Sequence, residues 1–205
     1  MTVLRVKGFE IHKGHLDPAA QAEVLEAVRG IVRAAPLFHP TTSRGQQMSV
    51  RMTSAGDAGW ISDHKGYRYQ TRHPNGMPWP PIPDPIRAVW TAISGSEARP
   101  TSCLVNFYAE GARMGIHQDR DEEQFDAPVV SVSLGAPGLF RMGGTERSDP
   151  TSSIWLESGD CVVMGGPARL AFHGIDRIKP GPSQLIPGGG RVNVTLRAVN
   201  PLQYK

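Results

Sequence analysis

The second half of the chain, residues 101–199, is divided into short apolar segments by glycine-containing turns. Segments such as 129–134 and 191–197 alternate in character from one residue to the next, which is the period of a β-strand. Gly135, Gly143-Gly144 and Gly165-Gly166-Pro167 separate them, and these residue types favour tight turns. Many short strands at close spacing predict a closed or double-sheet β architecture such as a jelly roll, also called a double-stranded β-helix.

Two helices are predicted in the first hundred residues. Asp17-Pro18 and Asp84-Pro85 each combine an N-cap residue with a proline at the first helical position. Apolar residues then recur at helical spacing as far as Pro36 and Gly95. The fold class is therefore mainly β with flanking helices, and we expect both helices to lean on one sheet. Near the other end of the chain, we expect a strand at 170–172 and an irregular segment at 174–190, which is rich in glycine and proline.

The composition is that of a soluble globular protein. Of 205 residues, 39% are hydrophobic and 20% are charged, with a formal net charge of +3. This length favours one domain over residues 1–205, and we expect a monomer. No apolar run approaches the roughly 20 residues of a membrane helix, and the first residues do not form a signal peptide. The only two cysteines, Cys103 and Cys161, lie in apolar segments, as expected of reduced thiols in a cytoplasmic protein without membrane association.

A histidine and a carboxylate stand two residues apart at His117-Gln118-Asp119. In an extended backbone both side chains point to the same side. His173 supplies a distant second imidazole. Two imidazoles and one carboxylate, with the other coordination positions open, are the ligand set of a non-haem Fe(II) oxygenase. The same residues also fit a non-catalytic β domain in which the histidines are buried and hydrogen-bonded.

The last predicted strand places four polar side chains on one side: Arg191, Asn193, Thr195 and Arg197. An edge strand with a solvated polar face gives the same alternation. Alternatively, the two arginines line a cavity and hold a dicarboxylate, because a guanidinium group pairs with a carboxylate through a planar fork.

Residues 41–83 differ from the rest of the chain because aromatic and basic residues are interleaved with prolines. This region begins with a predicted strand at 48–52, and its aromatic residues include Trp60, Tyr67 and Tyr69. Aromatic faces stack on bases while basic groups meet phosphate, which suits a single-stranded or extruded nucleotide. The alternative is a proline-rich lid whose aromatic residues merely pack on the β-core.

Taken together, these motifs resemble the AlkB family of Fe(II)- and 2-oxoglutarate-dependent dioxygenases, which demethylate alkylated nucleobases. Residues 101–199 are similar to the catalytic core, and residues 48–79 are similar to the nucleotide-recognition lid. The matching motifs are Asn106-Phe107-Tyr108, His117-Gln118-Asp119, Ser131-Val132-Ser133-Leu134-Gly135, Gly143-Gly144, Gly159-Asp160, His173-Gly174 and Arg191-Val192-Asn193-Val194-Thr195-Leu196-Arg197.

The resemblance implies a role for each matching residue. His117, Asp119 and His173 would hold Fe(II). The residues implied to bind 2-oxoglutarate are Asn106, Tyr108, Arg191, Asn193 and Arg197, with the two arginines meeting its two carboxylates. The residues implied to contact the substrate are Trp60, Tyr67, Arg68, Tyr69, Asp121 and Arg147.

The implied activity is oxidative demethylation of bases of the 1-methyladenine and 3-methylcytosine type, a direct reversal of alkylation damage. The partner would be single- or double-stranded DNA, with RNA as a second nucleic acid. The cosubstrates 2-oxoglutarate and O2 would give succinate and CO2, and the methyl group would leave as formaldehyde. Residues 1–100 would provide helices and lid, and residues 101–205 the dioxygenase core. Two alternatives are a 2-oxoglutarate-dependent hydroxylase or demethylase of a protein or small molecule, and a non-catalytic jelly-roll binding module.

Overall fold

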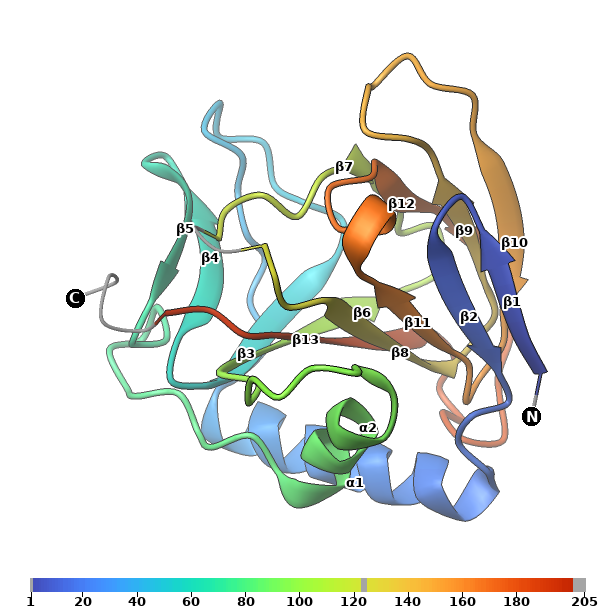
Figure 1. Cartoon of the computed structure of the whole chain (residues 1–205). Helices are drawn as coiled ribbons and strands as arrows, with labels where there is room; N and C mark the ends of the chain where they lie inside the picture. Colours follow the sequence, from blue (N-terminus) through green and yellow to red (C-terminus); the bar gives the residue numbers. More distant parts are fainter. Residues whose placement is uncertain (1, 123–124, 201–205) are drawn as a thin grey trace.

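Two antiparallel sheets face each other in the computed structural model, which describes residues 2–122 and 125–200 (Figure 1). In spatial order the larger sheet consists of β1 (Thr2–Val6), β2 (Phe9–Lys13), β11 (Cys161–Met164), β8 (Val129–Gly135), β13 (Arg191–Arg197), β6 (Ser102–Tyr108) and β3 (Arg51–Gly56). The smaller sheet consists of β10 (Ser152–Leu156), β9 (Gly138–Met142), β12 (His173–Ile178) and β7 (Met114–His117). This arrangement confirms the predicted jelly roll.

Helices α1 (Pro18–Ala34) and α2 (Asp84–Ile93) lie together on the outer face of the larger sheet (Figure 1). The predicted N-cap of α1 is confirmed, because the carboxylate of Asp17 accepts the Ala20 N–H at 2.8 Å. The predicted cap of α2 is wrong. Pro83 occupies the N-cap position, and Asp84 lies in the first turn and forms an ion pair with Arg87. Within residues 2–122 and 125–200, no helix has the length and apolar character needed to cross a membrane.

Strand β13 lies in the interior of the larger sheet, between β8 and β6. Its apolar residues, Val192, Val194 and Leu196, pack against the core beneath the helices. Its polar residues face the space between the two sheets, and all seven residues of the strand are buried. The edge-strand interpretation of this segment is therefore wrong.

A two-stranded hairpin, β4 (Gly59–Asp63) and β5 (Gly66–Gln70), stands beside the β-core within the predicted lid region (Figure 1). One face packs through Ile61 on Trp79 and Ala35. Gly59 permits this contact, since a Cβ at this position would lie only 2.3 Å from the Trp79 ring. The hairpin is thus anchored through one face, and its other face is turned toward the β-core.

Two strand boundaries differ from the predictions. The strand predicted at 48–52 is shifted along the chain, because the ladder with β6 runs from Arg51 to Gly56. The strand predicted at 170–172 begins instead at His173, after the short 3-10 helix η1 (Gly166–Ala168), and it continues to Ile178. The segment predicted to be irregular therefore starts with β12. Gly174 allows β12 to approach β7, because a Cβ there would lie 2.6 Å from the Met114 carbonyl oxygen.

The buried carboxylate of Asp160 joins the end of β2 to the turn that precedes β11 in the larger sheet. It accepts backbone N–H groups of Gly14 at 2.8 Å and Glu157 at 2.7 Å, and it forms an ion pair with Lys13. We expect Asp160→Ala to lower the free energy of unfolding by about 3 kcal/mol, because removing one partner of a buried charged contact costs about 3–5 kcal/mol and Lys13 is itself partly exposed. Urea-induced unfolding measures the change.

The control for this prediction is Asp17→Ala, which removes an exposed helix cap and should cost about 1 kcal/mol. A loss for Asp160→Ala no larger than that of Asp17→Ala would contradict the structural role of Asp160.

Candidate active site

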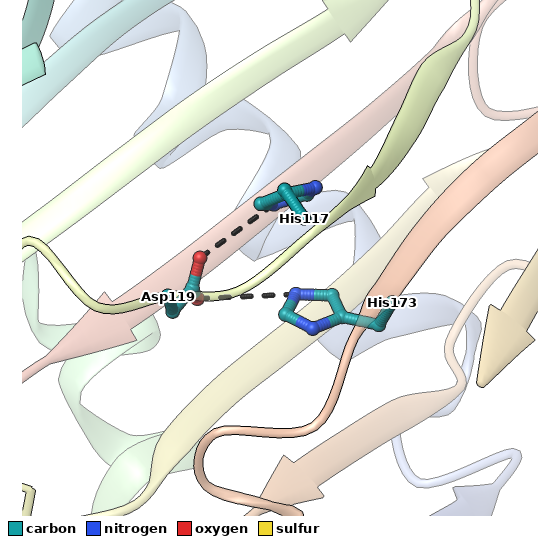
Figure 2. Close-up of side chains that lie close together, drawn as sticks. All are labelled: His117, Asp119 and His173. Carbon is teal, nitrogen blue, oxygen red and sulfur yellow. Dashed lines mark ion pairs between the residues drawn. The ribbon is translucent and has the colours of Figure 1, made fainter. Parts of the chain in front are cut away.

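Three side chains from two distant parts of the sequence meet between the two sheets (Figure 2). His117 ends β7, Asp119 follows two residues later, and His173 begins β12, where it pairs directly with His117. The Nε2 atoms of His117 and His173 lie 3.6 Å and 4.0 Å from the two carboxylate oxygens of Asp119. One potential ligand atom from each residue lies within 4.8 Å of the others, so the predicted triad is brought together.

Backbone carbonyl groups orient both histidines of the triad. Nδ1 of His117 lies 3.0 Å from the Gly115 oxygen, and Nδ1 of His173 lies 3.0 Å from the Ala171 oxygen. A carbonyl oxygen can only accept, so each Nδ1 donates to it, and each Nε2 faces Asp119. Burial, together with the neighbouring His117, lowers the pKa of His173 to about 4. His173 is therefore a neutral imidazole at neutral pH, as a metal ligand must be.

Arg197 fixes the charge and orientation of Asp119. Its Nη2 donates to Asp119 Oδ2 at 2.6 Å, and its Nε lies 3.2 Å from the same oxygen. Burial alone would raise the pKa of Asp119, but Arg197, followed by the two histidines, holds it well below its usual range. The carboxylate is thus ionised, and Oδ1 remains on the side of His117. Two imidazoles and an ionised carboxylate on one face fit Fe(II).

A small inner chamber of about 60 Å³ lies next to the triad, on the polar face of β13. All the residues implied to bind the cosubstrate line it: Asn106, Tyr108, Arg191, Asn193 and Arg197. Some are held by hydrogen bonds, since Asn193 donates to Ser131 Oγ at 2.7 Å and the Tyr108 hydroxyl lies 3.7 Å from Met114 Sδ. The chamber is therefore a defined polar cavity within an apolar core.

Arg191 is a fully buried cation with no ion-pair partner in the described part of the chain. Its guanidinium donates to Ser133 Oγ at 2.7 Å and to backbone oxygens of Ala136 and Leu156 at 3.3 and 3.4 Å. Burial lowers the pKa of Arg191 to about 10, so the group is still charged at neutral pH. A buried charge is costly unless an opposite charge compensates it.

Two unpaired donors of the chamber fit a dicarboxylate. Within residues 2–122 and 125–200, Arg191 Nε, Arg197 Nη1 and Asn106 Oδ1 are buried and have no hydrogen-bond partner. The two guanidinium N–H groups can each donate to a carboxylate, and the chamber opens onto the metal ligands. Residues of this type suit 2-oxoglutarate, which has a carboxylate at each end.

A larger outer cavity of about 720 Å³ adjoins the triad and lies between the β4–β5 hairpin and the β-core. Its volume is in the range of about 300–1,000 Å³ that is common for ligand pockets. Most of the residues implied to contact the substrate line it: Trp60, Tyr67, Tyr69, Asp121 and Arg147. His117, Asp119 and Arg197 line both the cavity and the inner chamber.

Trp60 is the centre of the aromatic wall of the outer cavity. Its ring stacks on Tyr67, with centroids 5.6 Å apart and an interplanar angle of 23°. Its Nε1 donates to Asp121 at 2.8 Å and connects the hairpin to the segment after β7. On the other side of the cavity, Arg147 donates to the Ile116 oxygen at 3.3 Å.

Arg68 is the one implied substrate residue that does not line the outer cavity. Side chains alternate along β5, so Tyr67 and Tyr69 face the cavity and Arg68 faces away. Arg68 forms two hydrogen bonds of 2.7 Å with Asp63 of the neighbouring strand. The structure therefore does not bring Arg68 to the wall of the outer cavity with the other implied substrate residues.

Two buried charged residues near the triad were not predicted from the sequence. Glu122 is 5% exposed and contacts both Arg197 and Arg169. Arg169 is also 5% exposed, and it donates to the Asp119 backbone oxygen at 2.7 Å. The sequence showed Glu122 only as part of an acidic segment and Arg169 only beside a glycine-rich turn, so neither carried a signal of burial.

Comparisons with known proteins agree with this geometry. The model of the 2OG-Fe(II) oxygenase superfamily matches residues 8–197. The alpha-ketoglutarate-dependent dioxygenase AlkB homolog of Caulobacter vibrioides is 53% identical over 193 residues, which cover 94% of this chain and 88% of that protein. The alpha-ketoglutarate-dependent dioxygenase AlkB of Escherichia coli is 39% identical over 167 residues, covering 79% and 77%.

The solved structure of OsALKBH1 has the same fold, with a TM-score of 0.78 at 27% identity, and the match covers 96% of this chain and 99% of that one. Alpha-ketoglutarate is another name for 2-oxoglutarate, so the names of these relatives agree with the triad and the arginine-lined chamber. The chain belongs to the AlkB family of Fe(II)- and 2-oxoglutarate-dependent dioxygenases.

Proposed function

We propose that this enzyme oxidatively demethylates N-alkylated nucleobases of the 1-methyladenine and 3-methylcytosine type, as a direct reversal of alkylation damage. The observation that carries the proposal is the aromatic wall of the outer cavity, which stands beside the metal ligands. Bases stack on aromatic side chains, and a base can reach a buried metal centre only when it is extruded or single-stranded. Trp60 would provide the main stacking surface.

The names of two further relatives support a nucleic-acid substrate. The DNA N(6)-methyladenine demethylase ALKBH1D of Arabidopsis thaliana is 31% identical over 218 residues, which cover 93% of this chain and 49% of that protein. The tRNA demethylase abh1 of Schizosaccharomyces pombe is 35% identical over 111 residues. We propose DNA as the main substrate and RNA as a second one.

In this mechanism the protein binds, orients and shields the reacting groups. His117, Asp119 and His173 would hold Fe(II) by two imidazole nitrogens and one carboxylate oxygen. Fe(II) with 2-oxoglutarate and O2 supplies the oxidising chemistry, in which the cosubstrate becomes succinate and CO2 and the methyl group leaves as formaldehyde. Arg191 and Arg197 would each bind one carboxylate of 2-oxoglutarate, which fixes its orientation in the chamber.

Other side chains complete the two cavities. Asn106, Tyr108 and Asn193 would contact 2-oxoglutarate from the walls of the chamber. Asp121 and Arg147 would contact the nucleotide from the outer cavity, where Asp121 is held by the Trp60 N–H. Burial of the chamber excludes water from the cosubstrate, which strengthens its pairing with the arginines.

We propose a cytoplasmic monomer that acts on single- and double-stranded nucleic acid with little sequence preference. The net charge of +3 supports salt-dependent binding to phosphate. An oxygenase of a protein or small molecule would share the triad and the chamber, but it would have no need of the aromatic wall.

Replacing Trp60 separates these alternatives. We expect Trp60→Ala to lower kcat/KM for a methylated oligonucleotide by about 10- to 100-fold, because base stacking on an aromatic ring contributes about 1–3 kcal/mol. Consumption of 2-oxoglutarate without substrate should continue, since Trp60 does not line the inner chamber. Mass spectrometry of the oligonucleotide and assay of succinate measure the two rates.

The matched control is Trp155→Ala, because Trp155 lies on β10 and does not line the outer cavity. Repair at the wild-type rate by Trp60→Ala would show that the aromatic wall does not bind the base.

Replacing Arg191 tests the inner chamber. Wild-type protein with Mn(II) and 2-oxoglutarate at 100 times its Kd should gain about 2.7 kcal/mol of stability, because a ligand of the native state stabilises it by mass action. We expect Arg191→Met to lose this gain while the protein without ligand keeps its stability, since the variant removes a buried unpaired cation. Thermal unfolding with and without 2-oxoglutarate measures both quantities.

Arg141→Met serves as the control, because Arg141 pairs with Asp176 and does not line the chamber. An undiminished gain for Arg191→Met would rule out the proposed carboxylate contact.

A further inference from the structure

The carboxylate of Glu122 joins the hairpin to the residues around the triad. Oε1 accepts the Tyr69 hydroxyl of β5 at 2.6 Å and lies 3.1 Å from Arg197 Nε of β13. Oε2 lies 3.3 Å from Arg169 Nη2, which precedes β12. Four separate segments of the chain therefore meet at one carboxylate that is 5% exposed.

The Tyr69 hydroxyl acts only as a donor in this contact. Burial, opposed by Arg197 and reinforced by Glu122, raises the pKa of Tyr69 well above its ordinary value. The phenol is therefore neutral at any pH at which the protein works. A hydrogen bond from a neutral hydroxyl to a buried carboxylate is charge-assisted and depends strongly on geometry.

Arg197 is oriented by two carboxylates at once. Its Nε is shared between Asp119 Oδ2 at 3.2 Å and Glu122 Oε1 at 3.1 Å, and Nη2 donates to Asp119. The remaining nitrogen, Nη1, is buried and has no hydrogen-bond partner within the described residues. Because the guanidinium is planar, fixing Nε and Nη2 also fixes the direction of Nη1.

Arg169 holds the other side of the same cluster. It donates through Nη1 to the backbone oxygen of Asp119 at 2.7 Å and through Nε to that of Ala127 at 3.0 Å. Glu122 is thus held between two buried arginines, and the backbone of a metal-ligand residue is held by one of them. The four charged groups, Asp119, Glu122, Arg169 and Arg197, balance each other.

We propose that Glu122 is a positioning residue that couples closure of the β4–β5 hairpin to binding of 2-oxoglutarate. When the hairpin is closed, Tyr69 hydrogen-bonds to Glu122, and Glu122 holds Arg197 with Nη1 directed to the cosubstrate. When the hairpin opens, Glu122 loses its contact with Tyr69 and Arg197 is held less firmly. Hairpin closure therefore increases the affinity for 2-oxoglutarate, and by thermodynamic reciprocity 2-oxoglutarate favours closure by the same factor.

The coupling depends on the Fe(II) and 2-oxoglutarate chemistry of the family and not on the nucleobase substrate. Its test contains no nucleic acid, so a failed demethylation assay would leave it intact. Binding is measured by anaerobic titration with Fe(II) and 2-oxoglutarate, followed by the absorption band of the chelate. Closure is measured by amide hydrogen exchange of residues 59–70, with and without both ligands.

The variant for this test is Tyr69→Phe, which removes one hydroxyl group and keeps the ring. We expect it to weaken 2-oxoglutarate binding by about tenfold, within the usual range of coupling between sites. The protection that both ligands add to the hairpin amides should fall by a similar factor. Glu122→Gln should give at least the same two losses, because it removes the charge that strengthens the Tyr69 contact and holds Arg197. Adding Tyr69→Phe to it should cost little more, because the two residues act through the same contact.

The matched control is Asp63→Asn, which breaks the ion pair with Arg68 on the opposite face of the same hairpin. It should increase exchange of the hairpin amides equally with and without ligands, and it should leave the Kd for 2-oxoglutarate unchanged. If Glu122→Gln does not fold, Tyr69→Phe alone still tests the proposal. Wild-type affinity for 2-oxoglutarate in Tyr69→Phe, or an equal loss in Asp63→Asn, would overturn the proposal.

Discussion

The ion pair between Arg197 and Asp119 is the interaction on which the site depends. It joins β13, an interior strand of the larger sheet, to the segment that follows β7 of the smaller one, with 2.6 Å between Nη2 and Oδ2. Both groups are more than nine-tenths buried, where either charge alone would be very costly. The pair also determines which oxygen of Asp119 remains for a metal. The fold and the ligand set are therefore specified by the same contact.

The alternation of β13 predicted correctly which of its side chains share a face. Arg191, Asn193 and Arg197 do line one chamber, and Val192 and Val194 do pack under the helices. The sequence could not decide whether the polar face meets water or a cavity, because both environments select the same residue types. The polar face meets a cavity because β8 and β6 flank β13 on both sides, so that β13 is not at the edge of the sheet.

The residues that the sequence did not reveal act through distant partners. Tyr69 and Glu122 are 53 positions apart, and Glu122 and Arg169 are 47 apart. A local pattern gives the side of a strand to which a residue points, but it does not name the group that it meets there. Arg68 shows the same limit, since it stands between two cavity tyrosines in the sequence but lies on the other face of β5. The ligand triad was predictable because its motif stands within matching motifs over residues 101–199.

The buried charges also indicate in which combination the ligands bind. Asp119 and Glu122 balance Arg169 and Arg197, and Arg191 leaves the site with one uncompensated positive charge. A divalent cation alone would add two more positive charges to this poorly solvated region. A doubly charged dicarboxylate arriving with the metal cancels these two charges, and it gives Arg191 the carboxylate partner that none of residues 2–122 and 125–200 provides. Charges interact strongly in a medium of low dielectric constant. Each ligand therefore increases the affinity of the site for the other.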